Sequence, residues 1–134
     1  MATFTLQIIT PERLLFSGEA KMIRVRASTG DMAILAGHID FAGALGIGEA
    51  KVVFPDGTER LAACNSGVLT MKDNVCRVAA VTFEWADEID TERAQKAEEA
   101  ARKRLEAIQD RESHEWSLAD AKLRRALARL NVKH

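Results

Sequence analysis

The stretch that decides the fold is Glu84-Trp-Ala-Asp-Glu-Ile-Asp-Thr-Glu-Arg-Ala94. Before it, apolar and polar residues alternate with the two-residue period of β-strands, and Gly and Asn mark the turns. After it, apolar residues recur every three or four positions, as in helices, and Gly and Pro are absent. We therefore predict a β domain over residues 1–85 and a helical domain over residues 86–134, joined by this acidic hinge.

The composition describes an ordinary soluble chain. Its 134 residues are 47% hydrophobic and 29% charged, with a formal net charge of -1, which argues against a general nucleic-acid binder. No apolar run is long enough to span a bilayer, and the first residues lack the pattern of a signal peptide, so we expect a cytosolic protein without direct membrane insertion. Charge is segregated: residues 84–92 carry five acids, whereas residues 121–134 carry only bases.

The β half shows short alternating segments separated by turn residues. Spacing of about ten residues between such segments is typical of an antiparallel sandwich or barrel. Asp56-Gly57 predicts a hairpin turn, and further turns are expected at Ser17-Gly18, 65–67 and 72–74. The predicted strands cover residues 3–9, 21–27, 32–35, 50–54, 59–64, 68–71 and 75–81.

The helical half predicts two helices with a short polar connection. Asp90 is a good N-cap for the first, and Asp110 or Ser113 can cap the second. Two helices joined in this way form an antiparallel hairpin. Its expected seam is mostly alanine with a few leucines, so we predict that it needs a neighbour and separates from it at low energetic cost. The predicted seam residues are Ala94, Ala97, Ala101, Leu105, Ile108, Trp116, Ala119, Leu123, Leu127 and Leu130.

The sequence offers little for catalysis. His38 is the only histidine of the β half, so a metal site with several converging ligands is not expected there. Phosphate-binding glycine loops and the nucleophile elbow are absent. Cys64 and Cys76 lie in apolar strands and are expected to be buried hydrophobes. We predict neither catalytic residues nor a metal site.

Three motifs, spread along the chain in order, resemble the ε subunit of bacterial F-type ATP synthases. They are Ile9-Thr-Pro-Glu-Arg-Leu-Leu-Phe-Ser-Gly18, Gly30-Asp-Met-Ala-Ile-Leu-Ala-Gly-His38 and Ala126-Leu-Ala-Arg-Leu130. The resemblance implies an α+β fold: a β-sandwich of about ten strands followed by a two-helix hairpin. Ala36 and Asp40 replace prolines of the family pattern, and 65–67 replaces a Ser-Gly-Gly turn.

The resemblance also implies partners. It predicts a non-catalytic rotor subunit, peripheral at the cytoplasmic face of the cell membrane, that binds the γ subunit and the c-ring and couples catalysis to ion transport. The matching c-ring positions are Asp31, Gly37, His38 and Ile39, although Asp31 could equally be a turn former and His38 an ordinary loop residue.

The resemblance also implies that the helical hairpin regulates ATP hydrolysis. Extended along γ, such helices inhibit ATP hydrolysis by the α/β catalytic head. In this sequence Arg124, Arg125 and Arg129 are the expected contacts with that head, because a basic tract can meet an acidic surface.

The hinge matches a regulatory ATP motif of some family members, carried here by Ile89, Asp90, Arg93 and Ala94. Guanidinium groups bind phosphate oxygens, and a carboxylate accepts from an amine or hydroxyl. Glu84, Arg125 and Arg129 match accessory positions, whereas Ala100 replaces an arginine of strong ATP binders. The alternative stays open that Asp90 is only a helix cap and Arg93 an ordinary surface residue.

Two other function classes are the alternatives to a rotor subunit. A free-standing nucleotide sensor would need the ATP motif but no γ subunit, whereas a β-sandwich enzyme would need a ligand set that the sequence lacks. No cofactor is required under the leading hypothesis, and ATP enters it only as a regulatory ligand.

Overall fold

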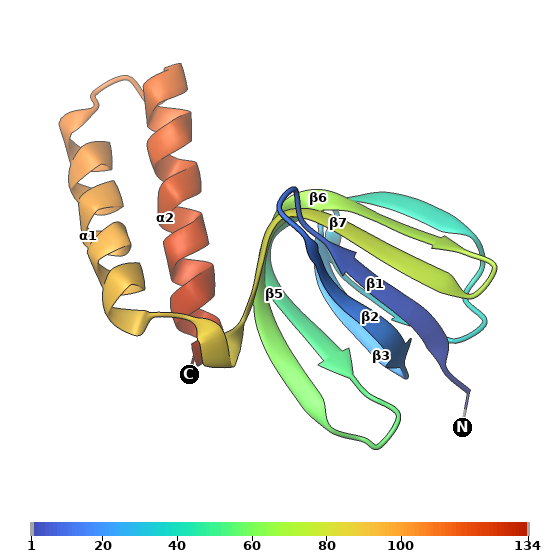
Figure 1. Cartoon of the computed structure of the whole chain (residues 1–134). Helices are drawn as coiled ribbons and strands as arrows, with labels where there is room; N and C mark the ends of the chain where they lie inside the picture. The colour runs from blue at the N-terminus through green and yellow to red at the C-terminus, as the bar shows by residue number, and fades with distance from the viewer. Residues whose placement is uncertain (1, 134) are drawn as a thin grey trace.

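The computed structural model describes residues 2–133 and shows two parts side by side (Figure 1). A β domain holds all seven strands, and a pair of antiparallel helices stands against one side of it. The strands are β1 (Phe4–Ile9), β2 (Leu14–Ala20), β3 (Met22–Ala27), β4 (Gly30–Leu35), β5 (Phe41–Val53), β6 (Glu59–Lys72) and β7 (Val75–Trp85). A single turn of 3-10 helix, η1 (Ala86–Glu88), leads to α1 (Thr91–Ala107) and α2 (His114–Lys133).

The strands form one hydrogen-bonded sheet in the order β2-β1-β7-β6-β5-β3-β4. The pairing of β1 with β7 is parallel, and the remaining pairings are antiparallel. The sheet folds over itself, because buried side chains from all seven strands belong to one core cluster. The predicted α+β fold with a sandwich is confirmed, with one parallel pairing in an otherwise antiparallel sheet.

Among residues 2–133 seven strands are present where about ten were expected, in part because two expected turns lie inside strands. Ser17-Gly18 is part of β2, and 65–67 is part of β6. In β6 the core-facing side changes from Ala62 and Cys64 to Leu69 and Met71. Ser66 and Gly67, with φ of 50° and 150°, shift the alternation between the two halves, so one long strand serves both layers.

Apolar side chains, many of them large, fill the sandwich core. Phe4, Leu6 and Ile8 of β1 are completely buried, as the alternation predicted. At the hinge end of the core, Trp85 contacts Phe16 and Phe83, and Phe16 also contacts Phe54. The ring centres of these pairs are 5.1–6.3 Å apart, in edge-to-face geometry. This core is made entirely of sandwich residues and does not depend on the helices.

The helices begin at the predicted caps. Asp90 Oδ1 accepts a hydrogen bond from the Arg93 amide at 3.1 Å and caps α1, and Ser113 Oγ accepts from the Trp116 amide at 3.1 Å at the start of α2. The seam differs from the prediction in detail, since Ala97 is exposed and several predicted leucines are only half-buried. The helical residues that are fully buried are Ala94, Ala101, Ala119, Ala126, Ala128 and Val132.

A second, small cluster joins the hairpin to the sandwich. Ile89 of the hinge packs with Ala63 of β6 and with Ala128 and Val132 of α2. Only α2 packs closely on the sandwich, against β5 and β6, while α1 lies on the outer side of α2 (Figure 1). The hairpin therefore rests on the sandwich through a few small side chains.

Candidate functional site

The hinge opens onto a cavity of about 600 Å³. Its walls come from the end of β7, the first turns of α1, one residue of α2 and the connection between β1 and β2. Six of the seven predicted ATP-site residues line it: Glu84, Ile89, Asp90, Arg93, Ala94 and Arg129. The predicted site residues, which are up to 45 positions apart in sequence, are thus brought together.

Not all of these side chains are available to a ligand. Ile89 and Ala94 are only 5% and 2% exposed, so they pack in the cavity walls and offer a ligand little surface. One oxygen of Asp90 caps α1, which leaves the other carboxylate oxygen for a donor. Arg93 is exposed at the mouth and has no ion-pair partner among residues 2–133. Both readings of Asp90 therefore coexist in one side chain: it is a cap that also lines a cavity.

Glu84 and Arg129 form a direct link between the two parts of the molecule. Arg129 Nε donates to Glu84 Oε1 at 2.7 Å. Both side chains are partly exposed, Arg129 at 26% and Glu84 at 36%. A partly exposed pair of this kind stabilises a contact by about 1 kcal/mol. It closes one side of the cavity and fastens α2 to β7.

Arg125 lies on a neighbouring surface. It lines a groove of about 500 Å³ between α1 and α2, as well as a small crevice of about 10 Å³ between α2 and β6. Arg129 borders the cavity, the groove and the crevice. Arg124 instead faces outward and pairs with Asp120 Oδ2 at 3.3 Å. In this arrangement Arg125 and Arg129 are half-buried where α2 borders the sandwich, whereas Arg124 is exposed.

A clamp at the hinge was missed from the sequence. Arg60 of β6 stacks its guanidinium 4.0 Å from the ring centre of Trp85 and donates from Nη2 to both oxygens of Asp87 at 3.0 and 3.3 Å. It therefore holds the end of β7 and η1 in one geometry. No sequence pattern links position 60 to positions 85 and 87, because the link depends on the β6–β7 register.

The predicted c-ring residues lie at two places, with Asp31 in the β3–β4 hairpin and Gly37, His38 and Ile39 in the loop that follows the other end of β4. Asp31 is exposed and 3.5 Å from Arg26 Nη1. Gly37 has φ of 77°, and His38 Nδ1 lies 2.7 Å from the carbonyl oxygen of Ile39. Ile39 is 79% exposed, the most exposed of the large apolar side chains in the described chain. The loop presents an apolar tip that nothing in the sandwich covers.

Asn74 fixes this loop and was also missed. Its Oδ1 accepts from the Gly37 amide at 3.0 Å, and its Nδ2 donates to the Thr3 carbonyl at 2.9 Å. Asp40, where the family pattern has proline, accepts from the Asp73 amide at 3.3 Å. The β6–β7 turn thus supports the loop through the Asn74 side chain and the Asp73 backbone amide.

The two cysteines of the sandwich are buried. Burial raises the pKa of Cys64 and of Cys76 to about 12, so both thiols stay protonated. Among residues 2–133, no group of three or more His, Cys, Asp or Glu side chains is placed to hold a metal ion. In the same range, no helix combines the length and apolarity needed to cross a bilayer.

Two family models together match nearly the whole chain. The model described as ATP synthase, Delta/Epsilon chain, beta-sandwich domain matches residues 3–86, and the model described as ATP synthase, Delta/Epsilon chain, long alpha-helix domain matches residues 87–133. The chain belongs to the ATP synthase delta/epsilon family. The models meet within η1, at the hinge.

Curated relatives in this family are ATP synthase epsilon chains. That of Ruminococcus albus is 35% identical over 133 residues, covering 98% of this chain and 97% of its own length. The epsilon chain of Caldicellulosiruptor bescii is 38% identical, with 98% and 94% covered, and that of Shouchella clausii is 34% identical, with 100% and 98% covered. The resemblance to the bacterial epsilon subunit is confirmed. As a member of this family, the chain is an accessory subunit of the ATP synthase and not the catalytic one.

Solved structures share the fold at lower identity. A chain in the Euglena gracilis mitochondrial ATP synthase, OSCP/F1/c-ring in rotational state 1, superposes with a TM-score of 0.85 at 22% identity, covering 100% of this chain and 83% of that one. A chain of the Tetrahymena thermophila mitochondrial ATP synthase central stalk/c-ring gives a TM-score of 0.64 at 13% identity, with 97% and 96% covered. Both of these epsilon-like folds come from ATP synthases.

Proposed function

We propose that this epsilon-family chain is a central-rotor subunit that joins γ to the c-ring, and that its hairpin regulates ATP hydrolysis. The observation that carries the regulatory part is the contrast between a large sandwich core and a hairpin fastened by a cluster of four buried residues and one ion pair. Such an attachment can be exchanged for another surface at low cost. The similar folds in a c-ring assembly and a central stalk support the rotor role.

The loop end of the sandwich is the proposed c-ring contact. Ile39 presents an exposed apolar side chain, and the Asn74 and Asp40 hydrogen bonds hold the loop in shape. Contact with the c-ring would place the chain peripherally at the cytoplasmic face of the membrane and couple it to transport of protons or sodium. Replacing Ile39 with Asp should weaken attachment of a reconstituted rotor to the c-ring.

Ending the chain after Asp87 tests the regulatory part. The sandwich core keeps all its members, so γ binding should be retained, while any inhibition of ATP hydrolysis by the reconstituted complex should disappear. The full-length chain is the control. Unchanged hydrolysis, with γ binding intact, would contradict a regulatory hairpin.

The hinge cavity is the proposed regulatory ATP site. Glu84 and Asp90 offer carboxylate oxygens for an amine or hydroxyl, and Arg93 and Arg129 offer guanidinium groups for phosphates. A ligand held between β7, α1 and α2 stabilises the hairpin in its place on the sandwich and disfavours the extended form. Ala100 contributes no charge, so the affinity is expected to be weaker than with arginine there.

A thermal-shift measurement with and without ATP tests this site on the isolated chain. ATP should raise the melting temperature, and Arg93→Ala should remove that rise. Lys96→Ala, at an exposed position one turn along α1 that lies outside the cavity lining, is the matched control. A shift of equal size in Arg93→Ala would count against the hinge cavity.

The alternative of a free-standing nucleotide sensor makes the same thermal-shift prediction, so it needs a different experiment. Co-purification with γ at a one-to-one ratio supports the rotor subunit. Recovery of the chain without γ, from cells that contain the assembled complex, would favour the sensor.

A further inference from the structure

Arg60 continues the pairing of β6 with β7 beyond the point where the ladder ends. The last pair of that ladder is Ala62 with Trp85, and the same register places Arg60 opposite Asp87. Position 87 is no longer in a strand, because η1 begins at Ala86. The Arg60 side chain reaches it instead, with Nη2 at 3.0 and 3.3 Å from the two Asp87 oxygens. A side-chain contact therefore takes the place of the next backbone pair and ties η1 to β6.

The guanidinium group of Arg60 is itself held by Trp85. Its central carbon lies 4.0 Å from the centre of the indole ring, which is only 3% exposed and packs against Phe16 and Phe83 of the core. A planar guanidinium can stack on a ring and still donate within its own plane to a carboxylate. The Arg60 clamp, made of Arg60, Trp85 and Asp87, thus consists only of residues from β6, β7 and η1.

The residue before Trp85 makes a contact of the opposite kind. Successive side chains of a strand point to opposite faces, and Glu84 accordingly pairs with Arg129 of α2 at 2.7 Å. That pair is lost when the hairpin leaves the sandwich, whereas the pair of Arg60 with Asp87 involves neither α1 nor α2. The end of β7 therefore carries one contact that needs the docked hairpin and one that does not.

Two residues with extended backbones, Ile89 and Asp90, separate η1 from α1. Ile89 packs with Ala63 of the sandwich and with Ala128 and Val132 of α2, so it loses part of its contacts when α2 leaves. Rotation about the backbone bonds of Ile89 would move α1 and α2 together and leave η1 in place.

We infer that the Arg60 clamp keeps η1 on the sandwich when the hairpin leaves, so that the hairpin turns about Ile89 and Asp90. The inference rests on the exchangeable hairpin of the proposed function. Arg60 is accordingly a positioning residue for the regulatory movement, because it fixes the point from which the helices depart. Without Arg60, the flexible segment grows from residues 89–90 to residues 86–90.

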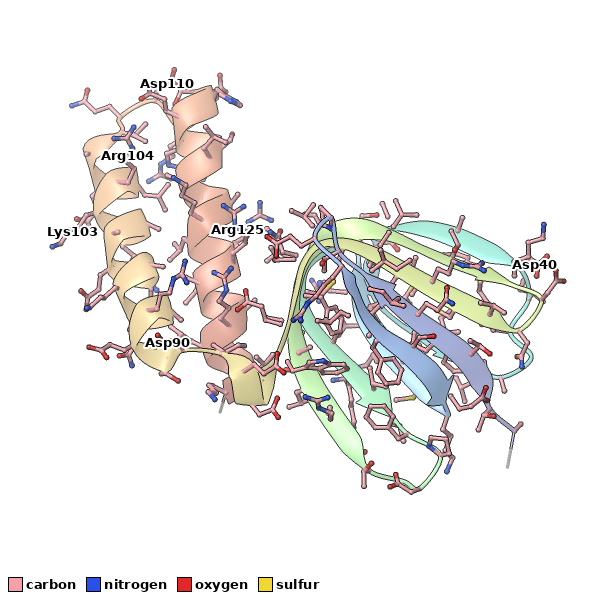
Figure 2. All side chains as sticks on the ribbon, viewed as in Figure 1. Asp40, Asp90, Lys103, Arg104, Asp110 and Arg125 are labelled. Atoms are coloured by element: carbon pink, nitrogen blue, oxygen red, sulfur yellow. The ribbon has the colours of Figure 1, made fainter. Side chains whose placement is uncertain are left out.

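Spin-label distances in the full-length chain test this inference. One variant carries labels in place of Lys72 and Glu88, and a second carries them in place of Lys72 and Lys103, all exposed positions. Lys72 is the last residue of β6 and Glu88 the last of η1, whereas Lys103 points away from the sandwich on α1 (Figure 2). The native cysteines are buried, so the label attaches to the introduced ones.

Val132→Asp places a carboxylate in the cluster between α2 and the sandwich and should release the hairpin. The 72–103 distances should then spread widely, while the 72–88 distances stay as narrow as in the docked chain. Adding Arg60→Ala should broaden the 72–88 distances by up to about 10 Å, the span of a flexible segment of three residues. Arg60→Ala alone should not broaden them, because the docked hairpin still holds Ile89.

Two further variants make the comparison specific. Arg24→Ala breaks a pair of similar exposure with Glu49, at 3.1 Å between β3 and β5, and should leave the 72–88 distances narrow after release of the hairpin. Arg60→Lys keeps the charge but loses the planar stack and the fork of donors, so an intermediate width is expected. Melting curves verify that each variant is folded, and Arg60→Lys replaces Arg60→Ala if the latter is not.

The outcomes separate this inference from the proposed function. If the 72–88 distances broaden equally with and without Arg60, or stay narrow in both, the clamp inference is overturned while the released hairpin stands. If Val132→Asp leaves the 72–103 distances unchanged, the exchangeable hairpin is contradicted and its pivot with it. Broadening of the 72–88 distances only when Arg60 and the docked hairpin are both lost supports the clamp.

Discussion

The sandwich and the hairpin differ in the size of the side chains that they bury. The sandwich buries Phe4, Leu6 and Ile8 with other large side chains, whereas the buried residues of the helices are five alanines and one valine. Burial stabilises in proportion to apolar area, so a large side chain contributes about 1.5–3 kcal/mol and an alanine methyl group far less. The difference indicates that packing stabilises the sandwich more strongly than it stabilises the hairpin.

The largest effect that would sharpen this comparison is expected at Gly67. A Cβ atom there would lie 2.1 Å from the Ala79 carbonyl oxygen, and φ of 150° is unsuited to a side chain. Gly67→Ala should therefore destabilise the sandwich by more than about 3 kcal/mol, or prevent folding. Gly57→Ala is the matched control, since φ is also positive but nothing lies within 4 Å, and about 1 kcal/mol is expected. Equal melting temperatures for the two variants would contradict the role given to Gly67.

A second pair of variants compares the two cores directly. Leu6→Ala empties a fully buried site and should cost about 2–5 kcal/mol, seen in the urea midpoint followed by Trp85 fluorescence in a Trp116→Phe background. Ala126→Gly, at an equally buried site of α2, should cost about 1 kcal/mol, seen mainly in the helical circular dichroism. If the two probes melt together in both variants, the sandwich and hairpin form one cooperative unit and the contrast is smaller than the burial indicates.

The Glu84–Arg129 link offers a smaller, more selective change. Glu84→Gln should lower global stability by no more than about 1 kcal/mol but increase hydrogen exchange along α2, because the hairpin is less firmly held. Exchange in β1 and β7 should not change. Glu92→Gln, which breaks an exposed pair with Lys96 at 3.9 Å within α1, is the control. Identical exchange in α2 for the two variants would show that the link does not hold the hairpin.

The smallest effect concerns the cysteines of the sandwich. Burial raises the pKa of Cys64 and Cys76 to about 12 from a usual value near 9.0. The folded state favours the neutral thiol, so this contribution is present below about pH 9 and is lost as the pH rises from 9 towards 12. Native protein should react slowly with a thiol reagent at pH 8 and rapidly in denaturant. Fast native labelling would show that the sandwich core opens more readily than its packing indicates.

Most of the fold could be predicted from local patterns. Alternation gave β1 and β3, the Asp56-Gly57 turn lies between β5 and β6, and Asp90 caps α1 as expected. The strand count could not be predicted, because residues 65–67 have the composition of a turn. In the structure Ser66 adopts φ of 50° inside β6, and the strand continues past it. The division of the chain into domains at residue 85 stays a prediction, although the family models meet one residue later.

The candidate site was predictable only in part. The hinge motif identified Asp90, Arg93 and Glu84, but the opposite wall comes from the β1–β2 connection, which no local signal links to the hinge. The helical bases were predicted as one tract, yet Arg124 is exposed and Arg125 is half-buried where α2 borders the sandwich. Side-chain direction within a helix depends on what covers each face, and that is a property of the packed molecule.

The place of β7 in the sheet has a mechanical consequence. The hairpin is attached to the end of β7, which lies between β1 and β6 and is hydrogen-bonded to both. A pull on the hairpin along β7 loads both ladders in shear, so their hydrogen bonds share the force instead of breaking one after another. The contacts of α2 with β5 and β6 are instead peeled from one end. Under tension along β7, the contacts of α2 with β5 and β6 should therefore break before the pairings of β7 with β1 and β6.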